Sequence, residues 1–341
     1  MNIGRNRFKR VILQAIVTMA ICGNVAADTW RYAHEEYEGD VQDVYAHSFK
    51  EYIESNSKHK LKIYRFGELG ESDDIMEQTQ GGILQFVNQS PGFTGSLIPE
   101  AQIFFIPYLM PTEMKAVVQF FRDSKAINQM FPELYNTQGL ELLKMYPEGE
   151  MVVTADEPVT SPEGFAGKKI RVMTNPLLSS TYDAFGATPT PLPWGEVYGA
   201  LQTNMIQGQE NPIFWIESGG LYEVSPNLIF TKHGWFTTAM MANQDFFEGL
   251  PEEDRKLVRK AADHAFEVII KHIDGLADRA LAKIMKASDK VTVTRLNEEQ
   301  IGTFKARAPQ VEKKFIEMTG DGGNKLLDQF KKDLAAAGSA K

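Results

Sequence analysis

Hydrophobic and polar positions follow two different periods along this chain. Residues 60–66 alternate apolar and polar side chains, as a half-buried strand does. Val44, Phe49 and Ile53 recur at helical spacing in the segment before it. Strands and helices alternate in this way in two runs, one before and one after Leu140. This order predicts an α/β protein of two lobes, each a mainly parallel sheet flanked by helices.

A third pattern, from Pro251 to Ala287, is purely helical. Its apolar residues follow one another in steps of three and four: Val258, Ala262, Ala265, Ile269, Ile273, Leu276, Ala280 and Ile284. A helix of this length extends about 55 Å, which is longer than one lobe of about 150 residues is wide. We therefore expect a long helix that spans both lobes, with Gly275 as its weak point.

These patterns also suggest where the two lobes begin and end. We assign residues 28–150 and about 240–270 to the first lobe, and residues 151–239 and about 271–341 to the second. The chain then crosses between the lobes more than once, and a ligand cleft is expected between them.

The first 27 residues have the features of a secretory signal peptide. Basic residues precede an apolar stretch at 11–23, which is too short to span a bilayer. Val25-Ala26-Ala27 fits a cleavage site, so we expect cleavage after Ala27 and export to the periplasm.

Loss of this segment changes the composition. It carries four of the 36 basic residues, no acidic one and the single cysteine, so the mature chain has 32 basic and 45 acidic residues and no thiol. A net charge of −13 argues against nucleic acid and anionic membrane surfaces as partners. A small anion or zwitterion is still compatible, because it responds only to its local site.

Motifs for metal binding and covalent catalysis are missing from the sequence. The six histidines are scattered without a His-Glu-x-x-His frame, and no Gly-x-Ser-x-Gly, Walker or dinucleotide pattern occurs. We therefore expect no metal site, no cofactor and no enzymatic activity. A secreted hydrolase of the glycosidase type is kept as a remote alternative, because it needs only two carboxylates.

Arg171 is a candidate anion receptor. It stands at the end of a predicted strand, and Asn175 can cap the helix that follows. A guanidinium next to a helix N-terminus can bind a carboxylate through two oxygens and nearby N–H groups. From this stretch alone, an arginine on the surface of an edge strand is an equally good interpretation.

Aromatic residues gather downstream of Arg171. Trp194 begins a helix, and Asn211 and Trp215 follow at the end of another predicted strand. Strand ends and the helix starts after them lie along one rim of a parallel sheet, so these four side chains could meet there. Core packing is the alternative for any single aromatic residue.

Several motifs together resemble a known family. They are Gly67-Glu-Leu-Gly70 with Glu77 and Gly81-Gly82, Lys169-Ile170-Arg171-Val172, and Ile206-Gln-Gly-Gln-Glu-Asn211-Pro212. Over essentially the whole mature chain, the sequence resembles the periplasmic solute-binding subunit of tripartite ATP-independent periplasmic (TRAP) transporters. Segments starting at Trp30, Gln89 and Pro193 most resemble members that bind ectoine and 5-hydroxyectoine.

The resemblance implies a two-lobed periplasmic binding protein of the Venus-flytrap type that closes on a zwitterionic compatible solute. Arg171 would bind the carboxylate with help from Asn211, and Glu36 would accept the amidinium N–H groups from the opposite lobe. The ring would be enclosed by Trp194, Trp215, Phe236 and Phe93. The protein, a monomer, would deliver the solute to the small and large membrane subunits of the permease.

A second solute class within the same family is an organic acid such as a C4-dicarboxylate or sialic acid. Arg171 would serve any carboxylate. Glu36 discriminates between the two classes, because a carboxylate facing the cleft repels a dianion and attracts a cation.

Overall fold

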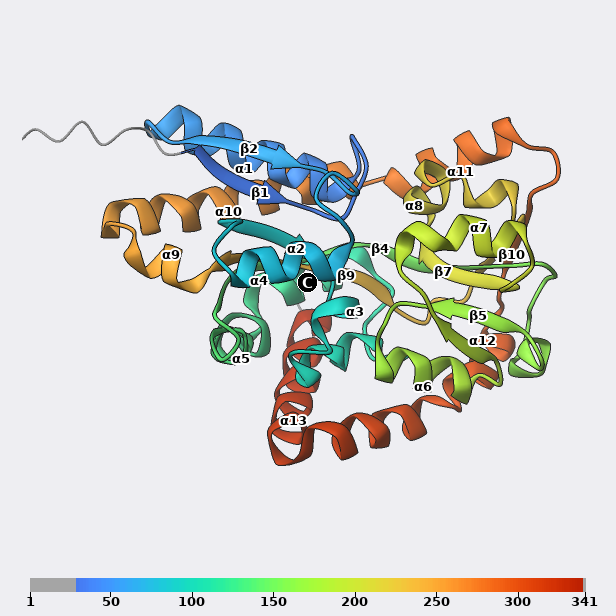
Figure 1. Cartoon of the computed structure of the whole chain (residues 1–341). Helices are drawn as coiled ribbons and strands as arrows, with labels where there is room; N and C mark the ends of the chain where they lie inside the picture. Colours follow the sequence, from blue (N-terminus) through green and yellow to red (C-terminus); the bar gives the residue numbers. More distant parts are fainter. Residues whose placement is uncertain (1–28, 340–341) are drawn as a thin grey trace, which may run out of the picture.

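A computed structural model describes residues 29–339 of the chain, so the predicted signal peptide lies outside the described residues. Two α/β halves lie side by side (Figure 1), and two long strands, β4 and β9, run between them. None of the described helices is both long enough and apolar enough to cross a membrane.

The strands form one mixed sheet in the order β2-β1-β3-β9-β4-β7-β5-β6, with β8 pairing β4 and β10 pairing β8. Pairing is parallel at each end, among β2, β1 and β3 and among β7, β5 and β6, and antiparallel along β9 and β4. The described strands are β1 (Thr29–Ala33), β2 (Lys60–Tyr64), β3 (Phe86–Gln89), β4 (Leu140–Ala155), β5 (Lys169–Val172), β6 (Thr188–Pro191), β7 (Gly208–Pro212), β8 (Asn227–Phe230), β9 (Trp235–Asn243) and β10 (Thr292–Arg295).

Strand β4 differs most from the sequence-based expectation. The pattern predicts a strand only from Met151 to Thr154, whereas β4 has 16 residues and starts at Leu140. Pro147 and Gly149 interrupt the alternation, and both residue types are unfavourable inside strands. The structure accommodates them with register shifts against β9, so that β4 continues from one half into the other.

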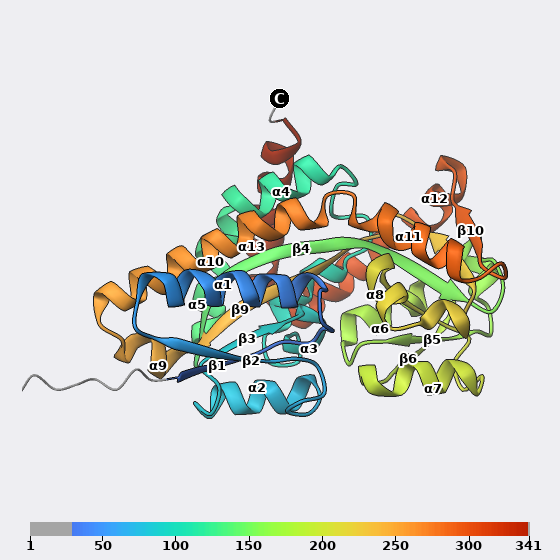
Figure 2. The ribbon, with the colours of Figure 1, turned by 90° about the horizontal axis from the view of Figure 1, so that it is seen from above.

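Helices cover both faces of the sheet (Figure 2). The half with β1 to β3 carries α1 (Val41–Asn56), α2 (Ser72–Gln80), α3 (Pro91–Thr94), η1 (Pro99–Phe105), α4 (Met114–Asp123), η2 (Ala126–Met130), α5 (Phe131–Asn136), α9 (Gln244–Gly249) and α10 (Glu252–Ile273). The other half carries η3 (Pro162–Phe165), α6 (Pro176–Ala184), η4 (Trp194–Glu196), α7 (Val197–Gln202), α8 (Ile213–Ser218), η5 (Leu221–Glu223), α11 (Leu276–Ala287) and α12 (Glu298–Lys305).

The expected long helix is interrupted where its glycine stands. Helix α10 ends at Ile273, Gly275 adopts a left-handed φ of 65°, and α11 begins at Leu276. Helix α10 packs on α1 and β4, whereas α11 packs on α8 of the other half. The two helices therefore follow one another along the molecule (Figure 2), and the break lies between the halves.

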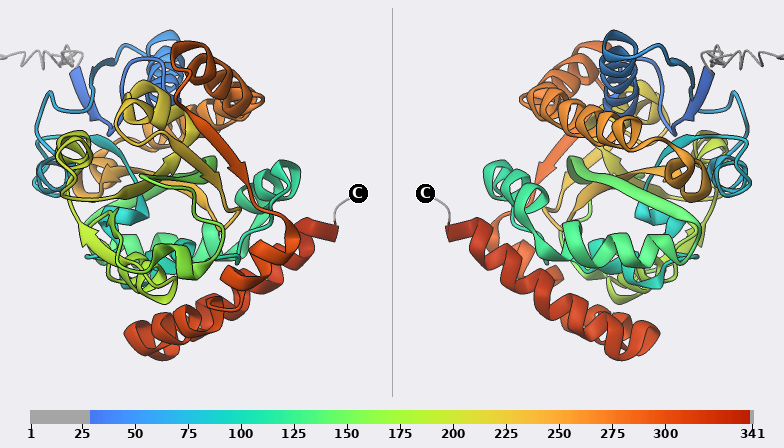
Figure 3. Two further views of the ribbon diagram at one scale, coloured as in Figure 1. Left: turned by 90° about the vertical axis from the view of Figure 1, so that its right-hand side faces the viewer. Right: turned by 90° about the vertical axis from the view of Figure 1, so that its left-hand side faces the viewer.

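Helix α13 (Ala308–Ser339) also joins the two halves. It packs against α4 and η1 of one half and α6 of the other. Its backbone leaves the helical region at Gly320, where φ is 64°. Figure 3 shows α13 along the lower side of the molecule, beneath both halves.

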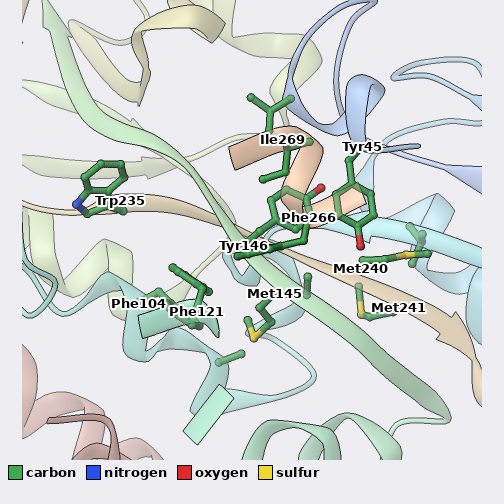
Figure 4. Close-up of a cluster of buried hydrophobic side chains, with 14 of the residues drawn as sticks. Tyr45, Phe104, Phe121, Met145, Tyr146, Trp235, Met240, Met241, Phe266 and Ile269 are labelled. Atoms are coloured by element: carbon green, nitrogen blue, oxygen red, sulfur yellow. The ribbon is translucent and has the colours of Figure 1, made fainter. Parts of the chain in front are cut away.

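The largest hydrophobic core lies between β4 and the helices packed on it (Figure 4). Tyr45 of α1 stacks on Tyr146 of β4 with ring centroids 4.6 Å apart, and the Tyr45 hydroxyl donates to the carbonyl of Ala262 in α10. A second buried cluster surrounds β5 and includes Phe93 and Phe236. Both clusters contribute side chains to the region between the halves.

Candidate functional site

Arg171 lies on β5 in the second half, and its side chain is only 2% exposed. It pairs with Gln209 of β7 and Thr190 of β6, which fixes the backbone on both sides. The Nε atom donates to the Leu192 carbonyl at 3.0 Å, and Nη2 is buried without a hydrogen-bond partner. The alternative of a surface arginine is therefore wrong.

The charge of Arg171 is only partly balanced. Burial lowers the pKa of its guanidinium to about 10, and Glu210, Glu71 and Glu35 oppose that shift through their charges. Among the described residues Arg171 has no direct ion pair, so a buried cation keeps a free N–H donor. Such a group is expensive to bury unless an anion reaches it.

A hydrogen-bonded network supports β7 on the face opposite Gln209 and Asn211. Glu210 accepts a hydrogen bond from the Tyr182 hydroxyl at 2.6 Å and lies 2.6 Å from Nε2 of His233. All three side chains are buried. The network fixes the Glu210 carboxyl group, which acts on Arg171 without a direct ion pair. Sequence reasoning did not include these residues in the site.

Asn211 lies two residues after Gln209 on β7 and is also buried. Because side chains two apart on a strand share a face, Asn211 and Gln209 point to the same side. The Asn211 Nδ2 donates to Oε1 of Gln209 at 2.5 Å, and Gln209 donates to Thr154 of β4. Since Gln209 pairs with Arg171, the predicted amide and guanidinium belong to one face of neighbouring strands.

The predicted aromatic side chains form a continuous row. Trp194 and Trp215 have ring centroids 4.6 Å apart, and Phe236 lies 5.5 Å from Trp215. The Arg171 Cζ atom is 5.9 Å from the Trp194 ring centroid. Nε1 of Trp215 is buried without a partner. Phe93, from α3 of the first half, belongs to the same buried cluster as Phe236.

Glu36 comes from the loop between β1 and α1 of the first half and is fully buried. Its Oε2 accepts the backbone N–H of Gln42 in the first turn of α1 at 2.6 Å, whereas Oε1 has no partner. Burial and the charge of Glu148 raise the pKa of the Glu36 carboxyl group. A buried carboxyl with a free oxygen is suited to accept N–H donors.

Three further acids accompany Glu36, and sequence reasoning missed them as site residues. Burial raises the pKa of Glu35 to about 8 and that of Asp40 to about 7, and it also raises the pKa of Glu148. A signal for an irregularity at Glu148 was present, because proline and glycine inside a strand often mark a β-bulge, and Pro147 and Gly149 flank this acid.

The loop that carries Glu36 is fixed by charged side chains. Asp43 accepts from Nε of Arg65 at 2.8 Å and lies 3.3 Å from Nε2 of His34. Burial acts to raise the pKa of Asp43, but these hydrogen bonds outweigh it and the pKa is lowered. The ionised Asp43 thus ties α1 to β2 and to the end of β1, which positions Glu36 between them.

The seven predicted side chains therefore separate into chemically distinct groups. The second half presents a buried cation and amide, the first half presents buried acids, and aromatic rings extend from Trp194 to Phe236. This arrangement can bind a small molecule that has an anionic end, a cationic end and an apolar ring. Within residues 29–339 no three His, Cys, Asp or Glu side chains are grouped so as to hold a metal ion.

Comparison with known proteins gives consistent results. Residues 32–318 match the family model of bacterial extracellular solute-binding protein, family 7. The chain is 76% identical over 313 residues to the ectoine-binding periplasmic protein TeaA of Halomonas elongata, covering 92% of each chain. It is 57% identical over 325 residues to the ectoine/5-hydroxyectoine-binding periplasmic protein UehA of Ruegeria pomeroyi, covering 95% of this chain and 96% of UehA.

The three-dimensional structure is also similar to that of a solved relative. A solved structure of the periplasmic ectoine-binding protein from the TeaABC TRAP transporter of Halomonas elongata superposes with a TM-score of 0.90 at 77% sequence identity. The match covers 91% of this chain and all of that one. The mixed sheet and the helices that join its halves are thus shared with a TRAP binding protein.

Proposed function

Because this chain belongs to the bacterial extracellular solute-binding protein family 7, we propose that it captures ectoine or 5-hydroxyectoine and delivers it to the membrane subunits of a TRAP transporter. The observation that carries the proposal is the pair of opposite buried charges. Arg171 has a free donor, Glu36 has a free acceptor, and they come from opposite halves. The similarity to TeaA and UehA supports the same solute class.

Ectoine fits these groups because it is a zwitterion with a carboxylate on a ring that holds a delocalised amidinium. The Arg171 guanidinium would bind the carboxylate, with Asn211 donating from its amide. Glu36 would accept an N–H group of the amidinium. The row of Trp194, Trp215 and Phe236, with Phe93, would enclose the ring and stabilise its spread positive charge.

The same arrangement explains how a solute would close the protein. A ligand that pairs with Arg171 in one half and with Glu36 in the other gains both ionic contacts only when the halves are together. Binding would then shift the population toward the closed state by hinge motion. The lobe boundaries predicted from the sequence and a cleft between the lobes belong to this proposal.

The cellular role follows from the same proposal. The protein would act as a periplasmic binding protein without enzymatic activity, as a monomer, after removal of an N-terminal signal peptide. Similarity to periplasmic TRAP binding proteins supports export and partnership with the small and large permease subunits.

The alternative solute, a C4-dicarboxylate or sialic acid, has less support. Arg171 suits any carboxylate, but the buried acids Glu36 and Glu148 give the opposite side of the site an acidic character that disfavours a second anionic group. Turnover by a secreted hydrolase has no supporting observation.

Isothermal titration calorimetry of the purified mature protein tests the proposal. Ectoine and 5-hydroxyectoine should bind with a stoichiometry of one, and a thermal-shift panel should show a raised melting temperature with these solutes. Succinate and sialic acid serve as matched negative controls. No heat of binding with ectoine up to millimolar concentration would contradict the solute assignment and leave the family unchanged.

A further inference from the structure

Glu148 occupies an irregular position in β4. In the pairing of β4 with β9, Pro147 stands opposite Thr237 and Gly149 opposite Phe236, so Glu148 is the extra residue of a β-bulge. Bulges redirect side chains and are common next to functional sites. The side chain is 1% exposed, and the strand opposite it carries Phe236, one of the predicted aromatic site residues.

The two oxygens of Glu148 have different surroundings. Oε1 accepts from the Thr238 hydroxyl at 2.5 Å and from Nε2 of Gln42 at 3.1 Å. Oε2 is buried and has no donor. Gln42 also donates its backbone N–H to Oε2 of Glu36, whose Oε1 likewise has no donor. Gln42 therefore donates to one oxygen of each carboxyl group, and the other oxygen of each carboxyl group has no donor.

Gln42 donates to both acids, through its backbone N–H to Glu36 and its side-chain amide to Glu148, so the two carboxyl groups lie close together. Two carboxylates at such a distance, out of water, cannot both be ionised without a cation nearby. The other titratable groups that act on them, Glu35, Asp40 and Tyr146, are all acidic. A single proton shared between the two acids would satisfy both free oxygens. The nearby base is His34, whose Nδ1 accepts the backbone N–H of Glu36, and burial lowers its pKa.

Resting on the proposed function, we propose that Glu148 is a second acceptor for the cationic end of the solute. It acts together with Glu36, and the bound cation displaces a proton that the two carboxyl groups share in the empty protein. The proton leaves to the solvent, and the positive charge of the solute takes its place between two carboxylates.

The chemistry of a cyclic amidinium favours two acceptors over one. Both nitrogens belong to the ring, so their N–H bonds diverge, and a single carboxylate cannot accept both in good geometry. Two carboxyl groups on different elements, the β1–α1 loop and β4, can accept one N–H each. A quaternary ammonium solute has no N–H to donate and should bind poorly, although it carries the same charge.

Calorimetry with ectoine in two buffers of different ionisation enthalpy measures the proton directly. At pH 7 the wild-type protein should release close to one proton per ectoine bound. The affinity for ectoine should also rise with pH, by up to tenfold per pH unit over the range in which the empty protein holds the shared proton. Glu148→Gln should weaken ectoine binding at least tenfold. It should also abolish proton release, because the glutamine amide can donate to an ionised Glu36.

Glu150→Gln is the matched control, since it makes the same change two residues along β4, at a carboxyl group that is influenced by Lys232 and Arg295 and not by Glu36. It should keep both the affinity and the proton release of the wild type. The wild-type measurement does not depend on any variant folding, and circular dichroism checks the fold of Glu148→Gln.

The outcomes separate the two proposals. Failure of the wild-type protein to bind ectoine would overturn the proposed function. Tight binding without proton release, or a Glu148→Gln affinity within threefold of wild type, would overturn the role of Glu148 and leave the proposed function standing.

Discussion

The indole Nε1 of Trp194 donates a hydrogen bond to the hydroxyl group of Tyr37 at 3.1 Å. Tyr37 belongs to the loop after β1, and Trp194 belongs to η4 of the other half, so this bond joins the two halves. Ser218 forms a second such bond, from its hydroxyl to Oδ2 of Asp40 at 2.9 Å. Both bonds involve or adjoin candidate site residues, and both join the two halves.

Removing these bonds should weaken solute binding by favouring the open state. For Tyr37→Phe and for Ser218→Ala we expect affinities about 2–10-fold lower, since a net hydrogen bond contributes about 0.5–1.5 kcal/mol. Stopped-flow fluorescence should show the loss mainly as faster solute dissociation. Tyr198→Phe is the control, because it removes a hydrogen bond to Glu223 within one half. Equal dissociation rates in all four proteins would contradict a role in closure.

Arg171→Ala should weaken ectoine binding by at least about 2–4 kcal/mol, because it leaves the buried solute carboxylate without its cation. Arg171→Lys should recover only part of the affinity, since an ammonium lacks the two-pronged donor geometry. Titration calorimetry measures both, with the exposed neighbour Lys169→Ala as control. A loss of less than tenfold for Arg171→Ala would show that another group binds the carboxylate.

Phe236→Leu keeps an apolar side chain but removes the aromatic face beside Trp215. Cation–π contacts contribute about 0.5–2 kcal/mol, so ectoine affinity should fall by roughly 2–30-fold. Phe304→Leu makes the same change in the same buried cluster, in α12, and should lower the melting temperature without changing the affinity. Indistinguishable affinities for the two variants would argue against stacking on the solute.

The stability of the empty protein should depend on pH through its buried acids. The folded-state pKa of Glu35, about 8, lies above its unfolded value, so the folded state binds more protons between about pH 4.5 and 8. Stability from this group is complete below the unfolded pKa and is lost as pH rises toward 8. Asp43, with its lowered pKa, acts in the opposite direction but only at more acidic pH.

Urea denaturation at pH 5 to 8 can measure this contribution. Glu35→Gln should reduce the slope of unfolding free energy against pH by up to about 1.4 kcal/mol per unit. Asp40, Glu36 and Glu148 also have raised pKa values, so part of the slope should remain in the variant. A slope identical to wild type would show that Glu35 is already ionised in the folded protein.

Gly275→Ala should destabilise the protein by about 1–2 kcal/mol, because φ at this position is 65° and an alanine is strained there. Gly302→Ala provides a matched control inside α12, where its added Cβ would meet no atom within 4 Å. Gly302→Ala should stabilise the folded protein by about 0.5–1 kcal/mol, because glycine is unfavourable inside a helix. Thermal unfolding of both variants checks the contrast, and equal shifts would contradict a special role for the break.

The spacing of apolar residues along the chain was sufficient to predict a large part of the fold. Alternation and helical spacing predicted the two α/β runs, and Asn175 does cap α6 by accepting from the Leu178 N–H. Only residues 151–154 of β4 were predicted as strand, because Pro147 and Gly149 interrupt the alternation of apolar and polar residues before them. The helix break at Gly275 was visible as a weak point, but a glycine in a helical pattern does not by itself fix its φ.

The sequence by itself determined the chemistry available to the site: an arginine at a strand end, a group of tryptophans, and acids after the first strand. Only the tertiary structure decided which of them are buried and which meet. Gln42 of α1 donates to both Glu36 and Glu148, which brings together an acid of the β1–α1 loop and the bulge residue of β4. Local spacing carries no information on such a contact, since it depends on the pairing of segments far apart in the chain and on the burial that removes water from both carboxyl groups.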